Sequence, residues 1–122
     1  ENVRKKLREV RQAGGQVFFS SISYFETQRG LLATQMQATR KMEVFEEFCQ
    51  CYEMLGTDKV ELLDEASTIY ADLKNRGELL LDADILIAAT ARSHNLTLVT
   101  DDSHFERIEG LTVENWLKSE NG

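Results

Sequence analysis

The sequence predicts a three-layer α/β/α domain with a parallel central sheet. Short apolar runs alternate along the chain with longer segments whose apolar residues recur at helical spacing, a pattern typical of parallel sheets covered by helices. The segment Ile85–Ala91 is apolar on every face, which predicts a helix buried on all sides, and the apolar run Leu96–Thr100 after it indicates a buried strand. Because 122 residues suit one domain, we expect residues 1–122 to fold as a single unit.

The first half of the chain is predicted to form three helices and one strand. An amphipathic helix spans Glu1–Ala13, and the strand Gln16–Ser20 follows a glycine turn. A second helix runs from Ser21 to about Ala38, and a third covers Arg40–Leu55 with apolar residues at i, i+3 and i+4 spacing. Aromatic residues of these segments are expected in the core rather than on a base-stacking platform: Phe18, Phe19, Phe25, Phe45 and Phe48.

The second half is predicted to contain two helices, one helical turn and three strands. Asp64 is expected to cap the first of these helices, and His94-Asn95 to close the buried one, since Asn tolerates a left-handed conformation. In chain order the predicted elements are a strand at Val60–Leu63, a helix from Asp64 to Arg76, the buried helix Ile85–Ala91, the strand Leu96–Thr100, a turn at Ser103–Arg107 and a strand at Leu111–Val113.

The charge of the chain excludes one class of nucleic-acid-binding protein. The formal net charge is −7 and the pI is about 4.8, whereas a protein that binds nucleic acid through a broad surface should be basic. No apolar run approaches the roughly 20 residues that cross a bilayer, nothing resembles a signal peptide, and Cys49 and Cys51 are expected to be reduced. These features together predict a cytoplasmic protein without a membrane segment.

Carboxylates gather at three places where a predicted strand meets a predicted helix. Glu26 lies one turn into the second helix, Asp84 (with Asp82 before it) heads the buried helix, and Asp101-Asp102 follow the strand Leu96–Thr100. These places should meet on one edge of the sheet, where open α/β folds carry their sites. Crowded like charges repel, and a bound Mg²⁺ or Mn²⁺ ion with oxygen ligands offsets that repulsion. Such a site can activate water against a phosphodiester.

Each acid also has a structural explanation. Ser23-x-x-Glu26 matches a capping box, Asp82 is a plausible N-cap, and Asp102 could cap the turn that begins at Ser103. Asp84 is harder to explain this way, because a carboxylate that leads an apolar helix into the core needs a partner. The joint placement of the acids, rather than any one of them, therefore favours a functional site.

Four segments resemble the PIN domain family, most closely its VapC-type ribonuclease toxins. In order they are Ser21-Ile-Ser-Tyr-Phe-Glu26-x-x-x-Gly30, Asp84-Ile-Leu-Ile-Ala-Ala-Thr-Ala, Leu98-Val-Thr100-Asp-Asp102-x-x-Phe105 and Gly110-Leu-x-Val-Glu-Asn-Trp116. The resemblance implies that Glu26, Asp84 and Asp102 are catalytic, metal-binding acids, with Asp101 as an alternate or supporting ligand. It also implies that Thr100 is a polar residue beside the site and that Ser21 or Ser23 orients the ligands.

The same resemblance implies an activity and partners. The expected activity is Mg²⁺-dependent endonucleolytic cleavage of RNA by metal-activated water, with Mn²⁺ as a possible substitute. The expected partners are the RNA substrate, a cognate antitoxin protein that obstructs the site, and a second copy of the chain in a homodimer. The basic face formed by Arg4, Lys5, Arg8 and Arg11 is expected to be a solvated helix face; otherwise it could guide RNA or receive an acidic antitoxin tail. His104 is expected to be an exposed loop histidine rather than a phosphate ligand.

The resemblance further implies a first strand that ends in an Asp, and no such segment occurs between Glu1 and the first predicted strand. We therefore expect the sequence to be N-terminally truncated, and inactive or nearly so unless another segment supplies that strand. Two alternatives stay open at this point. One is a catalytically silent PIN-like module that binds a protein partner, and the other is a different Mg²⁺-dependent phosphoryl-transfer fold in which Asp82 and Asp84 form the ligand pair.

Overall fold

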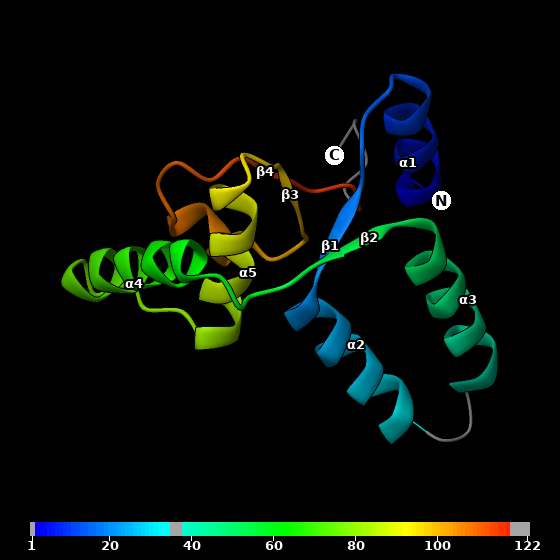
Figure 1. Ribbon diagram of the computed structural model, residues 1–122, viewed down its shortest axis with the longest axis horizontal. Helices are drawn as coiled ribbons and strands as arrows, with labels where there is room; N and C mark the ends of the chain where they lie inside the picture. The colour runs from blue at the N-terminus through cyan, green and yellow to red at the C-terminus, as the bar shows by residue number, and fades with distance from the viewer. Residues whose placement is uncertain (1, 35–37, 118–122) are drawn as a thin grey trace.

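The computed structural model describes residues 2–34 and 38–117, shown in Figure 1. The elements follow one another in the order α1 (Asn2–Gln12), β1 (Phe18–Ser20), α2 (Ser21–Ala33), α3 (Ala38–Cys51), β2 (Glu53–Leu55), α4 (Val60–Asn75), α5 (Asp82–Ser93), β3 (Leu98–Val99), the 3₁₀ turn η1 (Ser103–Arg107) and β4 (Val113–Glu114). The predicted α/β class and the order of most elements are confirmed. Part of the predicted end of the second helix, residues 35–37, lies outside the described residues.

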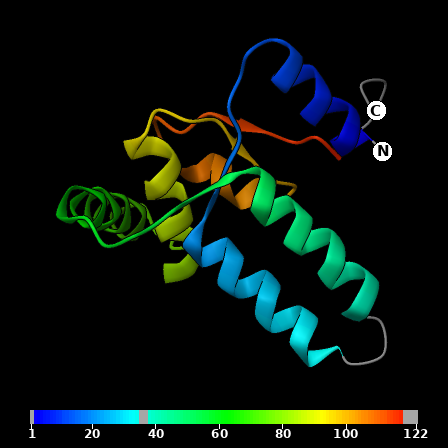
Figure 2. The same ribbon diagram turned by 45° about the vertical axis from the view of Figure 1, so that its right-hand side comes forward.

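The strands pair in parallel, as predicted. β1 pairs with β2, with Phe19 opposite Met54, and β3 pairs with β4, with Leu98 opposite Val113. In the described parts of the chain these are two separate two-stranded sheets. Figures 1 and 2 both show α2 and α3 as a hairpin that extends from the β1–β2 pair, while α4, α5 and η1 lie together on the other side.

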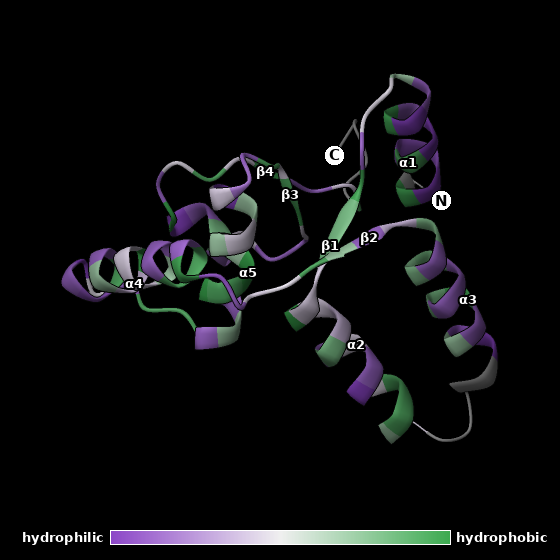
Figure 3. Ribbon diagram, in the orientation of Figure 1, coloured by the Kyte–Doolittle hydropathy of each residue, from purple (hydrophilic) through white to green (hydrophobic). Residues whose placement is uncertain are grey.

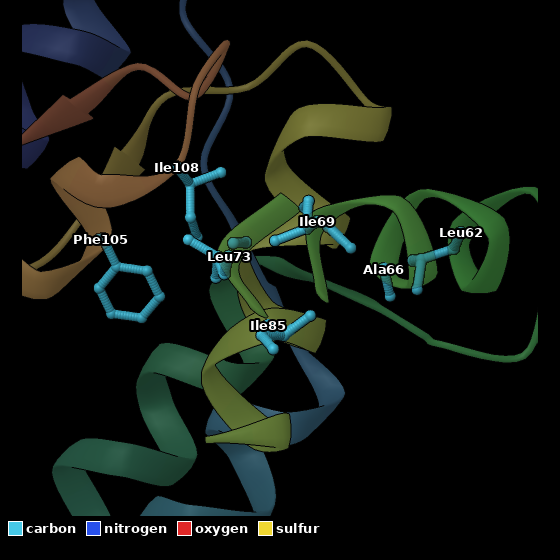
Figure 4. Close-up of a cluster of buried hydrophobic side chains, with 9 residues drawn as sticks. Leu62, Ala66, Ile69, Leu73, Ile85, Phe105 and Ile108 are labelled. Carbon is cyan, nitrogen blue, oxygen red and sulfur yellow. The ribbon is translucent and has the colours of Figure 1, made fainter. Parts of the chain in front are cut away.

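The buried core lies between α4, α5 and η1. Its members are Leu62, Ala66, Ile69, Leu73, Ile85, Ala88, Ala89, Phe105 and Ile108. Figure 4 shows how the larger of these side chains converge from the three elements. Ala88 and Ala89 are completely buried, and their small side chains let α5 approach its neighbours closely. The fully apolar stretch of the sequence is therefore the buried helix that was predicted.

Three predicted elements differ from the structure in type or in bounds. Val60–Leu63 is the first turn of α4 rather than a strand, and Asp64 lies inside that helix, whose N-cap is Lys59. The reason is that Leu62 begins the buried helical stripe of α4, four residues before Ala66. The predicted third helix ends at Cys51, because the following residues 53–55 form β2 and pair with β1. The last strand is also shifted, to Val113–Glu114.

Arginine side chains tie the segment around η1 to α4 and α5. Arg92 of α5 pairs with Glu65 of α4 and donates to the carbonyl oxygen of Glu109 at 2.8 Å. Arg76, at the end of α4, donates to the carbonyl oxygen of Arg107 and pairs with Asp72 at 2.8 Å. Hydrogen bonds with a charged donor are stronger than those between neutral groups. This network joins the end of η1 and the residues that follow it to α4 and α5.

The half of the molecule formed by α1, α2, α3 and the β1–β2 pair is more open. Aromatic rings contact one another there, with Phe19 and Phe48 centred 5.6 Å apart and Tyr24 and Phe45 5.4 Å apart, and these rings are half-buried or partly exposed. None of the five phenylalanines predicted for the core belongs to the buried cluster: four are half-buried and Phe25 is 57% exposed, so that prediction is wrong. Figure 3 shows that β1 is hydrophobic while much of α1 is hydrophilic. None of the helices in the described segments is long and apolar enough to cross a membrane.

Candidate active site

An open pocket of about 240 Å³ lies where α2, α5 and the C-terminal end of β3 meet. The residues that line it are Ser23, Glu26, Asp84, Ile87, Leu98, Val99, Thr100, Asp102 and Phe105. Three of these side chains are carboxylates, and each comes from a different segment of the chain. The structure thus brings together Glu26, Asp84 and Asp102, and with them Ser23 and Thr100. The lining does not include Ser21 or Asp101, and Asp101 is exposed.

Glu26 is directed to the pocket by the start of α2. Ser20 is the N-cap of this helix, and its Oγ accepts a hydrogen bond from the backbone N–H of Ser23 at 3.0 Å. The capping-box interpretation of Ser23 and Glu26 is therefore wrong, because Ser20 already satisfies that end of the helix. Glu26 lies in the second turn, where its carboxylate faces the pocket and also lies 3.9 Å from a guanidinium nitrogen of Arg29.

Asp84 lies in the first turn of α5. The N-cap of this helix is Leu81, which makes no side-chain capping bond, so the interpretation of Asp82 as N-cap is wrong. Asp82 is the first helical residue and is exposed, whereas Asp84 is half-buried and lines the pocket. Acids in the first turn interact favourably with the positive end of the helix dipole. This placement allows an acid to lead the most apolar helix of the chain.

Asp102 both caps the turn η1 and lines the pocket. Its Oδ1 accepts a hydrogen bond from the backbone N–H of His104 at 2.9 Å, and the Nδ1 atom of the same histidine lies 2.8 Å from that oxygen. The backbone N–H of Asp102 donates to Oγ1 of Thr100 at 3.1 Å. The capping role predicted from the sequence is therefore confirmed, and it fixes the carboxylate instead of excluding it from the pocket. His104 is 58% exposed, in line with the predicted loop histidine.

The three carboxylates affect one another electrostatically. Burial raises the pKa of Asp84 above its ordinary value, the negative charges of Asp102 and Glu26 raise it further, and His104 acts in the opposite direction. The hard oxygen donors of this set suit a Mg²⁺ or Mn²⁺ ion. Within residues 2–34 and 38–117, however, no three His, Cys, Asp or Glu side chains already stand close enough to hold a metal ion. The chemistry of the set fits a divalent cation, and binding one would draw the carboxylates together.

The raised pKa of Asp84 predicts a pH-dependent effect of Asp84→Asn on stability. A group whose pKa is raised on folding stabilises the native state while it is protonated, and that contribution is lost as the pH rises through its folded pKa. In EDTA, Asp84→Asn should therefore raise the urea midpoint at neutral pH, and this gain should shrink as the pH falls toward the ordinary Asp pKa of about 3.9. Urea unfolding of Asp84→Asn and wild type across a pH series measures this difference in midpoint. A gain in midpoint that does not vary with pH would contradict the prediction.

Sequence reasoning missed two features of the site. The first is the apolar wall made by Ile87, Leu98, Val99 and Phe105, which were placed in helix and strand but not beside the acids. The second is Arg29, whose proximity to Glu26 could have been found from their i, i+3 spacing on one helix.

Comparisons with known proteins give matches over most of the chain. The family model of the PIN domain matches residues 1–111. Ribonuclease VapC1 of Methanocaldococcus jannaschii is 34% identical over 105 residues, which cover 85% of this chain and 72% of the relative. The tRNA(fMet)-specific endonuclease VapC of Shigella flexneri is 32% identical over 103 residues, covering 84% of this chain and 76% of the relative.

Solved structures resemble the chain over most of its length. DNA-bound VapBC from Salmonella typhimurium superposes with a TM-score of 0.82 at 28% identity, covering 95% of this chain and 85% of the matched one. VapBC2 from Rickettsia felis, bound to a DNA fragment from its promoter, gives a TM-score of 0.84 at 25% identity, with 93% and 83% covered.

Proposed function

The chain belongs to the PIN domain family, and from this we propose that it is the endoribonuclease toxin of a toxin–antitoxin pair. The observation that carries the proposal is the pocket in which Glu26, Asp84 and Asp102 meet. The relatives named as ribonuclease and as tRNA endonuclease support RNA as the substrate. The alternative of a different phosphoryl-transfer fold is wrong, because the family match extends over residues 1–111.

Glu26, Asp84 and Asp102 would hold a Mg²⁺ ion, or Mn²⁺ in its place, through their carboxylate oxygens. Such an ion supplies a nucleophile from water and stabilises charge on the phosphate. The chain itself contributes orientation: the N–H of His104 and the neighbouring ring nitrogen hold Oδ1 of Asp102. Thr100 accepts from the backbone of Asp102 and so fixes the start of η1. Ser23, whose hydroxyl lies beside the pocket, would orient ligands next to Glu26.

We also propose a cognate antitoxin as the protein partner and a homodimer as the assembly. The support comes from two neighbours of known structure, both of them VapBC complexes bound to DNA. An antitoxin that covers the pocket would keep RNA from the carboxylates. A second copy of the chain in a homodimer follows from the family resemblance, and size-exclusion chromatography with light scattering tests it.

A second candidate function is a catalytically silent module that binds a protein partner. It is favoured by one observation: across the described residues, no three ligand-type side chains are already gathered around a point where a metal ion could sit. The two candidates differ in metal binding, because the enzyme must bind a divalent cation through Glu26, Asp84 and Asp102 and the silent module need not.

The deciding experiment uses the full-length protein encoded by the gene, incubated with bulk RNA in Mg²⁺, Mn²⁺ or EDTA. We expect cleavage with either ion and none in EDTA, because a carboxylate set without its cation cannot activate water. Titration with Mn²⁺, followed by electron paramagnetic resonance, should show binding that is lost in Asp84→Asn. Mn²⁺ binding without cleavage of any RNA would contradict the enzyme, and absence of both would favour the silent module.

A further inference from the structure

Arg29 and Phe25 form a small exposed cluster on α2 beside the carboxylate pocket. The guanidinium carbon of Arg29 lies 5.1 Å from the centre of the Phe25 ring, and one of its nitrogens lies 3.9 Å from the carboxylate of Glu26. The Arg29 side chain is 61% exposed and Phe25 is 57% exposed. We propose that these two residues are a nucleotide-binding subsite, in which Arg29 binds an RNA phosphate and Phe25 stacks on a base. The proposal rests on the proposed function.

Because the molecule is negatively charged, RNA binding requires a positively charged side chain near the pocket. With a net charge of −7 and three carboxylates around the pocket, the protein repels the phosphates of an approaching RNA. Arg29 bears a fixed positive charge next to Glu26, which lines the pocket. Its planar guanidinium group matches the geometry of phosphate oxygens. Arg29 is thus placed to attract the RNA at the point where the acids would repel it.

The contacts that Arg29 makes in the structure leave it available to a phosphate. An exposed ion pair between residues i and i+3 is weak, since solvent screens it and both long side chains lose rotational freedom. A phosphate that accepts two N–H bonds from the guanidinium can therefore displace Glu26. The Glu26 carboxylate, which already lines the pocket, then no longer shares its charge with Arg29. Substrate binding and the completion of the acidic site are coupled through this exchange.

Phe25 supplies a flat apolar surface at the same place. Phe25 and Arg29 are four residues apart on α2, so both lie on one helix face. A base can stack on the Phe25 ring or on the guanidinium plane that already covers it, and such stacking tolerates every base. More than half of this ring is exposed to solvent, so its removal should not disturb the fold. The pair thus combines a phosphate contact with a base contact.

The chain offers a matched control for Arg29. Arg40 of α3 is 76% exposed and pairs with Glu43 at 3.4 Å, also with i, i+3 spacing. It lies in the first turn of α3, the helix that follows the C-terminal end of α2, whereas Glu26 lies in the second turn of α2 (Figures 1 and 2). Arg40→Ala removes the same charge from the same kind of ion pair without touching the proposed subsite.

The test measures binding of a short fluorescent single-stranded RNA to the full-length protein in EDTA, at several salt concentrations. Each phosphate contact on a single strand contributes about 0.7 to the slope of log affinity against log salt. Arg29→Ala should lower that slope by about 0.7, while Arg29→Lys and Arg40→Ala keep it. Phe25→Ala should weaken binding roughly tenfold at an unchanged slope, and Phe25→Leu should not restore it. In cleavage assays Arg29→Ala and Phe25→Ala should each raise KM more than they lower kcat.

The outcomes separate this proposal from the proposed function. If the wild-type protein cleaves RNA but Arg29→Ala and Arg40→Ala give the same slope and KM, the subsite is overturned and the nuclease stands. If Arg29→Ala weakens binding of the purified cognate antitoxin and leaves RNA binding unchanged, the cluster belongs to the protein interface and the subsite is overturned. If the wild type neither binds nor cleaves RNA in any metal, the proposed function itself fails.

Discussion

Replacing Asp84 by asparagine should lower RNA cleavage by the full-length protein by at least about a hundredfold. Asp84 is half-buried in the pocket, and its pKa is raised first by burial and then by the charges of Asp102 and Glu26. A carboxylate under such repulsion gains most from a divalent cation and contributes most to holding it. Asparagine keeps the size and one oxygen but removes the charge. The loss should therefore appear in kcat and in Mn²⁺ affinity together, measured by steady-state cleavage and by titration.

Asp82→Asn is the matched control for this change. Asp82 lies two residues before Asp84 in the same first turn of α5, but its side chain is exposed and outside the pocket lining. Its replacement should leave cleavage within about twofold of wild type, since an exposed substitution far from special features has little effect on a rigid site. Equal losses in the two variants would contradict the exclusion of Asp82 from the site and would support a ligand pair formed by Asp82 and Asp84.

The sequence predicted which acids lie close together better than it predicted the bounds of the elements around them. Glu26 and Asp102 follow the C-terminal ends of two strands, β1 and β3, and Asp84 lies in the first turn of α5, so each position could be read from local sequence patterns. The helix α5 could also be predicted from the sequence, since a segment that is apolar on nearly every face must be buried in the core. Local patterns were sufficient wherever one rule applied without a competitor.

The wrong predictions of secondary structure and burial arose where two local patterns fitted equally well, or where contact with a distant segment determined the structure. Residues 60–63 read Val-Glu-Leu-Leu, a short segment that strand and helix patterns fit equally well, and only the burial of Leu62 in the core cluster distinguishes the two. Residues 53–55 become β2 because β1 lies beside them, and this pairing joins segments more than 30 residues apart. The exposure of Phe25 could not be predicted from the sequence either, since an aromatic residue on a helix is more often buried.

Replacing Leu73 by alanine should destabilise the protein by about 2 to 5 kcal/mol. Leu73 is completely buried on α4, within the same cluster as Ile85 of α5 and Phe105 of η1. Truncation removes apolar contacts and leaves a cavity that the helices can only partly close. Because small domains are stable by only about 5 to 15 kcal/mol, this loss is a large part of the total. Urea unfolding should show a lower midpoint with an unchanged slope.

Leu63→Ala provides the comparison, because Leu63 occupies the same helix but is 44% exposed. Its replacement should cost less than about 1 kcal/mol, since the side chain loses little buried area and alanine favours the helix. Leu73 also supports the site, because its cluster holds Ile85 and Phe105, and the first of these follows Asp84 directly while the second lines the pocket. Cleavage by Leu73→Ala should accordingly fall at a lower temperature than cleavage by Leu63→Ala. If the two variants unfold at the same urea concentration, the core between α4, α5 and η1 does not hold the acids in place.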